Sequence, residues 1–141
     1  MVPDDGGNHK EKYNNNGGFE LRFINYLKKI RDNYVINQVK NIVLPDFNPS
    51  PRTRKRIIFK GRVQKVGFRL EINELANRLY LTGWVINRND KNVEAEIQGE
   101  TDKILFLLKY MKSLKRASVQ EVLTNELPIL DSETDFILIK E

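Results

Sequence analysis

The sequence predicts an α+β domain. Two patterns of apolar residues indicate it, together with the order in which the patterned segments follow one another. Apolar and polar residues alternate in short segments, whereas two longer segments repeat apolar residues every three or four positions. These segments follow one another as β-α-β-β-α-β, with a short extra strand at the end. That order is typical of a ferredoxin-like α/β sandwich, in which two helices cover one face of an antiparallel sheet. With 141 residues and 40% hydrophobic content, the chain is long enough to bury such a core.

Alternation and helical spacing place each element of the predicted domain. Residues 56–63 form the first strand, with Ile57, Phe59 and Val63 on one face. An apolar stripe that starts at Phe68 and ends at Leu79 predicts the first helix. The remaining predicted elements are a strand at 82–86, a turn at 87–92, a strand at 93–98, a helix from 101 to 114, a strand at 117–124, a loop at 125–134 and a final strand at 136–139.

The first and third strands of this fold are neighbours, so their polar faces meet on the open side of the sheet. We expect Lys60 and Arg62 to lie beside Glu94 and Glu96 there. A face of paired charges is solvated and lacks the aromatic side chains on which RNA bases stack. Nucleic-acid binding by the domain is therefore not expected.

The first 55 residues differ in composition from the domain at residues 56–141. Residues 1–18 are rich in Gly, Asn and Lys, contain the lone His9, and predict a disordered tail. Apolar residues spaced by three or four from Phe19 to Tyr34 predict a helical extension over residues 19–44. Pro45 ends this helix, and residues 45–55 form a basic, proline-containing linker.

The charge and cysteine content narrow the partners and the compartment. Residues 1–56 contain 11 Lys or Arg and 6 Asp or Glu, so they carry the whole net charge of +5. A weak electrostatic contact with nucleic acid is expected from this basic N-terminal segment alone. The chain contains no cysteine and no apolar run approaching the roughly 18 residues of a membrane span. We therefore expect a cytoplasmic protein without membrane contact; its oligomeric state stays open.

The loop between the first strand and the first helix predicts an anion site. It runs from Gly61 to Phe68, where the helix begins. Backbone N–H groups and the positive end of the helix dipole converge at such a junction. Arg69 lies in the first helical turn, where a cation is unfavourable unless an anion binds beside it. The bound group that this arrangement favours is a phosphate.

The chemistry available around that phosphate is limited. The sequence has no P-loop, no cysteine, no histidine within the domain and no cluster of His and carboxylates, so no metal or other cofactor is expected. Backbone donors, Arg69 and polar residues such as Asn87 can bind phosphate and position a water. Without a strong base or nucleophile, such a site hydrolyses only a phosphate with a good leaving group. A carboxylate, with a pKa of about 4 to 5, is one, which indicates an acyl phosphate.

Three stretches of the sequence resemble the acylphosphatase family over about residues 56–141. They are Gly61-Arg-Val-Gln-Lys-Val-Gly-Phe-Arg69, Leu81-Thr-Gly-Trp-Val-Ile-Asn87 and Asp90-x-x-Val93-Glu94. The resemblance implies a ferredoxin-like fold and metal-independent hydrolysis of an acyl phosphate to carboxylate and phosphate. It implies that Arg69 binds the phosphate and that Asn87 orients the attacking water. The phosphate-binding loop that it implies consists of Gln64, Lys65, Val66, Gly67 and Phe68.

This sequence departs from the family pattern at several loop positions. Lys65, Tyr80 and Lys91 stand where the family usually has glycine, and Ile86 stands where it usually has arginine. If the backbone at position 65 needs a positive φ, a lysine there costs on the order of 1 kcal/mol. The alternative function is therefore a catalytically weak or inactive module that binds phosphate or a partner.

Overall fold

The computed structural model describes residues 4–140, with side chains from residue 17 onward, and divides the chain into two units. The first unit is Met1–Tyr34 and the second is Val35–Glu141. Helix α1 (Asp4–Lys40) begins in the first unit and ends in the second. No helix of the described residues is both long enough and apolar enough to cross a membrane.

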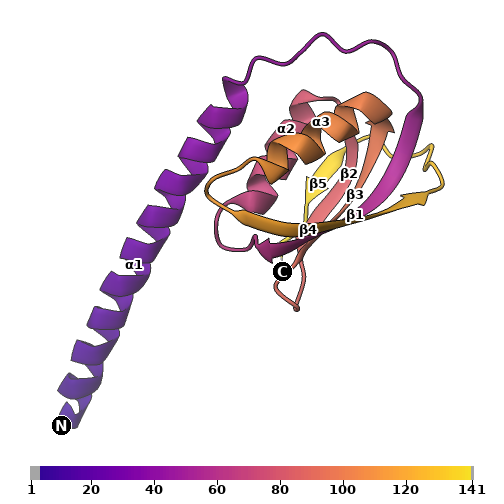
Figure 1. The fold of residues 1–141 in the computed structure, drawn as a ribbon. Helices are drawn as coiled ribbons and strands as arrows, with labels where there is room; N and C mark the ends of the chain where they lie inside the picture. The colour runs from indigo at the N-terminus through magenta and orange to yellow at the C-terminus, as the bar shows by residue number, and fades with distance from the viewer. Residues whose placement is uncertain (1–3, 141) are drawn as a thin grey trace. The chain divides into compact units, whose positions relative to one another are not determined.

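The second unit has the predicted ferredoxin-like fold. Its elements are β1 (Arg52–Arg62), α2 (Phe68–Arg78), β2 (Thr82–Asn87), β3 (Val93–Glu100), α3 (Thr101–Lys112), β4 (Ser118–Leu127) and β5 (Phe136–Leu138). They form one sheet of order β4-β1-β3-β2-β5. Helices α2 and α3 cover one face of this sheet (Figure 1). The pairings among β1, β2, β3 and β4 are antiparallel, whereas β5 pairs parallel to β2, so the sheet is mixed rather than wholly antiparallel.

The core lies between the sheet and the two helices. As the alternation predicted, Ile57, Phe59 and Val63 of the first strand region are buried. A β-bulge between Lys60 and Gly61 shifts the pairing with β4. Gly61 has φ 127°, and a Cβ there would lie 2.1 Å from the carbonyl oxygen of Ser118. The bulge therefore requires glycine at the point where β1 leads into the loop.

Helix α2 ends in a Schellman motif with an unusual residue at its left-handed position. The N–H of Leu81 donates to the Ala76 carbonyl at 2.9 Å, and that of Tyr80 to the Asn77 carbonyl at 3.2 Å. Tyr80 has φ 57°, in the region that glycine normally occupies at this position. The backbone thus keeps a glycine conformation although the side chain is a tyrosine.

Strand β1 starts earlier than predicted, and its register with β3 differs. It begins at Arg52, within the predicted linker 45–55, because β3 extends to Glu100 and pairs it. Arg56 lies opposite Glu96, and Ile58 opposite Glu94. The charges beside Glu94 and Glu96 consequently come from Arg54 and Arg56 and not, as predicted, from Lys60 and Arg62. Strand β4 likewise runs on to Leu127, which shortens the predicted loop 125–134.

Helix α1 differs from prediction at both ends. It begins at Asp4, so residues 4–18 of the predicted disordered tail are helical, while residues 1–3 lie outside the described residues. Extension of an existing helix is cheap because it needs no new nucleus. It ends at Lys40, before the predicted end at residue 44. There Arg78 donates to the carbonyls of Val39 and Ile42, both at 2.7 Å, and caps the last turn.

Candidate active site

The predicted loop of residues 64–68 leads from β1 into the N-terminus of α2. Gly67 is the N-cap residue in a left-handed conformation, φ 77° and ψ 15°, and gives the helix no side-chain cap. Lys65 is also left-handed, with φ 64°. The first N–H groups of an α-helix have no partner inside it. A loop with left-handed residues that leads into a helix N-terminus is a kind of backbone that binds anions.

Gln64 joins this loop to the turn between β2 and β3. Its Nε2 donates to the carbonyls of Arg88 and Asn92, at 2.8 Å each. The amide group of Gln64 therefore holds together the two sequence motifs, which are more than 20 residues apart. These bonds use the side chain of Gln64, and its predicted contact with phosphate stays a prediction.

Arg116 and Glu71 fix the loop from its other side, and sequence reasoning missed both. Arg116 donates through Nε to the Val66 carbonyl at 2.8 Å and pairs with Glu71 through Nη2. The carboxylate of Glu71 is fully buried and accepts a 2.6 Å hydrogen bond from Tyr110. A signal for Glu71 was present, because an acidic residue interrupts the buried side of a helix only when it is paired.

Arg69 extends from the first turn of α2 toward the C-terminal segment. Its Nη1 donates to the Ile139 carbonyl at 2.8 Å. The Ile139 N–H in turn donates to the Val85 carbonyl of β2 at 2.9 Å. The guanidinium group is thereby held at the end of the sheet where β2 leads to Asn87.

Asn87 is the last residue of β2, and its side chain is in an unusual state. The Oδ1 atom is buried and, within residues 17–140, has no hydrogen-bond partner. A buried acceptor without a partner costs about 1–3 kcal/mol, so proteins rarely leave one without a functional reason. The side-chain oxygen of Asn87 is therefore an unsatisfied acceptor at the end of β2, among the residues whose side chains are described.

The turn that follows Asn87 is held by charged groups. Arg88 Nε donates to both carboxylate oxygens of Asp90, at 3.1 and 3.2 Å, and Arg88 Nη1 donates to Glu94 at 3.2 Å. Burial raises the pKa of Asp90, but the Asn92 N–H and Arg88 outweigh it, so the net shift is downward. Lys91 occupies a left-handed position with φ 71°.

Replacing Lys91 with glycine is expected to stabilise the protein by about 0.5–1 kcal/mol. The left-handed conformation costs a non-glycine residue about 1–2 kcal/mol, from which the extra chain entropy of an unfolded glycine is subtracted. Urea unfolding of Lys91→Gly measures the gain. Lys91→Ala is the matched control, because it removes the charge and keeps the strain. Equal stability of the two variants would contradict this account of the turn.

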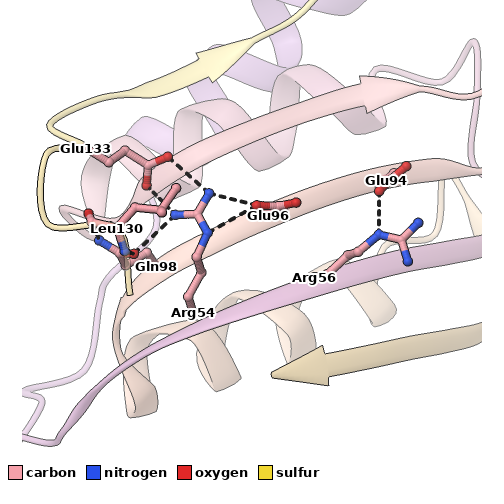
Figure 2. A network of polar contacts seen from close by, with 7 residues as sticks. All are labelled: Arg54, Arg56, Glu94, Glu96, Gln98, Leu130 and Glu133. Atoms are coloured by element: carbon pink, nitrogen blue, oxygen red, sulfur yellow. Dashed lines mark hydrogen bonds and ion pairs between the residues drawn. The ribbon is translucent and has the colours of Figure 1, made fainter. Parts of the chain in front are cut away.

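A buried arginine organises the open face of the sheet, at a distance from the phosphate loop in sequence. Arg54 is 1% exposed and donates to Glu96 at 2.9 and 3.1 Å and to Glu133 at 2.7 and 3.2 Å (Figure 2). Burial lowers the pKa of Arg54, but the hydrogen bonds and charges of Glu133 and Glu96 have the larger combined effect. The pKa of Arg54 is therefore raised overall.

Gln98 connects the same arginine to the loop after β4. Its Oε1 accepts from Arg54 at 3.2 Å and from the Leu130 N–H at 2.8 Å, while its Nε2 donates to the Leu130 carbonyl at 3.0 Å. Farther along β1, Arg56 donates to Glu94 at 2.6 Å (Figure 2). Arg54 therefore belongs to the sheet and fastens the 128–135 loop onto it, although the sequence placed it in a linker.

Comparison with known proteins gives a consistent family. The acylphosphatase family model matches residues 55–138. An acylphosphatase of Clostridium beijerinckii is 43% identical over 84 residues, which cover 59% of this chain and 93% of the relative. One of Pseudomonas aeruginosa is 40% identical over 70 residues, which cover 49% of this chain and 77% of the relative.

Solved structures agree with the sequence comparisons. The crystal structure of acylphosphatase from Bacillus subtilis aligns with a TM-score of 0.59 and 30% identity, over 62% of this chain and 99% of that one. The structure of an acylphosphatase from Coxiella burnetii aligns with a TM-score of 0.58 and 32% identity, over 62% and 93%. The family model alone covers more than half of the chain, and the chain belongs to the acylphosphatase family.

Proposed function

We propose that the second unit hydrolyses an acyl phosphate to a carboxylate and inorganic phosphate without a metal ion. The observation that carries this proposal is Oδ1 of Asn87, which is buried and has no hydrogen-bond partner among residues 17–140. It lies at the end of the strand whose following turn Gln64 joins to the phosphate loop. The relatives named acylphosphatase support it. The absence of cysteine from the chain favours the cytoplasm as its place of action.

The chemistry assigns one role to each group. The N–H groups of the loop at residues 64–68 and the guanidinium of Arg69 bind the phosphoryl oxygens and stabilise the charge that develops on them. Asn87 Oδ1 accepts a hydrogen bond from a water molecule. This orients the water so that a lone pair of the water oxygen faces the phosphorus. The water oxygen bonds to phosphorus as the bond to the acyl oxygen breaks, and the carboxylate leaves with that electron pair. The proton of the water passes to the phosphate, so no protein base is needed.

The Asn87→Ala variant tests this proposal. We expect kcat for benzoyl phosphate to fall by about 10²–10³-fold, in line with the loss of one positioning group. The thermal midpoint should stay equal or rise, since the variant removes a buried acceptor that has no partner in the described part of the chain. Asn89→Ala, at an exposed position of the same turn, is the control. Absence of turnover by the unaltered chain in EDTA, or full activity of Asn87→Ala, would contradict the proposal.

The left-handed lysine in the phosphate loop favours one alternative, a module that binds phosphate and turns over slowly. Lys65 pays a conformational cost at φ 64° in the loop that must fit the phosphate. Amide shifts of residues 64–69 on adding inorganic phosphate, without hydrolysis of benzoyl phosphate, would identify this alternative.

A further inference from the structure

The first unit has an apolar surface that the domain's chemistry does not use. Six side chains of α1 form the apolar stripe: Phe19, Phe23, Tyr26, Leu27, Ile30 and Tyr34. At 3.6 residues per turn they fall within an arc of about 100°, the width typical of a buried helix face. Yet each of the six is 48–63% exposed. Such a face is stable in water only when something covers it.

We infer that the apolar stripe is a dimerisation surface, on which a second copy of α1 packs antiparallel. The spacing of the stripe carries this inference. The intervals between its successive members are 4, 3, 1, 3 and 4 residues, which read the same in both directions. A two-fold axis between Tyr26 and Leu27 therefore brings Phe19 opposite Tyr34, and Phe23 opposite Ile30, of the other copy. This is the self-complementarity that an isologous interface requires.

The charges beside the stripe fit the same arrangement. Glu20 and Arg31 lie on the same flank of the helix, where an antiparallel two-fold axis makes like flanks meet. Around the midpoint of the stripe, Glu20 of one copy comes within about two residues, roughly 3 Å along the axis, of Arg31 of the other. Arg31 contacts Asp32 within its own chain at 2.9 Å. Its fork-shaped guanidinium has further N–H donors, so it can bind a second carboxylate as well. In a parallel pair in register, opposite flanks meet and positions 20 and 31 lie about 16 Å apart along the axis, so Glu20 and Arg31 could not pair.

The size of the stripe is sufficient for a specific dimer. Aromatic side chains bury about 150–250 Å² each, so four half-exposed ones and two aliphatic ones offer roughly 500 Å² per copy. The two copies together would bury about 1,000 Å², which is the lower limit for a specific interface. A reversible, concentration-dependent dimer is the expected result.

Mass measurement on the full chain tests the interface. Light scattering at increasing concentration should approach twice the chain mass of 16.5 kDa. Phe23→Glu should weaken dimerisation at least about 100-fold, because each copy would bury an unpaired carboxylate. Leu21→Glu is the matched control, since Leu21 is 59% exposed on the same helix but lies outside the stripe. A monomer at every concentration, or a dimer that only Leu21→Glu disrupts, would overturn the inference. Binding of the monomeric chain to lipid vesicles would overturn it too, because the stripe would then be covered by lipid.

Engineered cysteines test the orientation, since the chain has none of its own. Phe19→Cys alone should not crosslink, because its two thiols would lie about 22 Å apart, but Phe19→Cys mixed with Tyr34→Cys should form a disulfide. A parallel dimer would give the reverse result and overturn the antiparallel arrangement. The stripe takes no part in catalysis, so Phe23→Glu should hydrolyse benzoyl phosphate at the rate of the unaltered chain. Loss of the dimer and loss of the proposed function can therefore be told apart.

Discussion

Arg69→Ala is expected to lower kcat/KM for benzoyl phosphate by about 10³-fold or more. The variant removes the guanidinium that we assign to the phosphoryl oxygens, in a site with no metal-binding or basic group assigned to replace it. It also removes a hydrogen bond to the Ile139 carbonyl, a bond worth only about 1 kcal/mol of stability. Stopped assays under EDTA measure the first effect and urea unfolding the second.

Two further variants show whether the effect is specific. Arg69→Lys keeps the charge but loses the planar fork, so we expect it to recover only part of the activity. Arg62→Ala removes an exposed arginine at the end of β1 and should leave kcat/KM within about 2-fold. If Arg69→Ala still binds inorganic phosphate as tightly as the unaltered chain, the guanidinium does not hold the phosphoryl group and the assignment fails.

Arg54→Ala is expected to destabilise the second unit by about 3–5 kcal/mol. Arg54 is buried between Glu96 and Glu133, and its removal leaves two carboxylates without their cation. It also frees Gln98, which holds the loop after β4 through Leu130. A urea titration followed by tryptophan fluorescence reports the change, because Trp84 is the only tryptophan.

Arg56→Ala is the natural comparison for this variant. Arg56 pairs with Glu94 on the same strand pair, but its side chain is 37% exposed. Water therefore replaces the lost contact, and the cost should stay below about 1 kcal/mol. Adding Glu133→Gln to Arg54→Ala should restore part of the lost stability. Similar losses for Arg54→Ala and Arg56→Ala would show that burial does not decide the strength of these pairs.

The sequence predicted the order of elements well, because each has a local signal. The alternation around Ile57 and Phe59 and the stripe from Phe68 to Leu79 are patterns that tertiary contacts did not override. Strand register has no comparable local signal. It depends on the length of partner strands and on the bulge at Gly61, so the predicted neighbours Lys60 and Arg62 were wrong.

The site residues stay a prediction, and the structure adds how they are connected. Arg69 and the loop from Gln64 were predicted from the strand-to-helix junction, and Asn87 from the family resemblance. The bonds of Gln64 end on backbone carbonyls, which no pattern of side chains reveals. Arg54 was assigned to a linker because its two carboxylate partners lie 42 and 79 residues away along the chain.

The three left-handed residues Lys65, Tyr80 and Lys91 also bear on how much mutation the protein tolerates. At roughly 0.5–1 kcal/mol each, they lower the free energy of unfolding by about 2 kcal/mol in total. The free energy of unfolding of a whole protein is typically about 5–15 kcal/mol. An average substitution costs about 1 kcal/mol, so the chain should accept fewer of them before it unfolds than a relative with glycine at these positions. Restoring glycine at positions 80 and 91 is therefore a sound first step before the active site is mutated extensively.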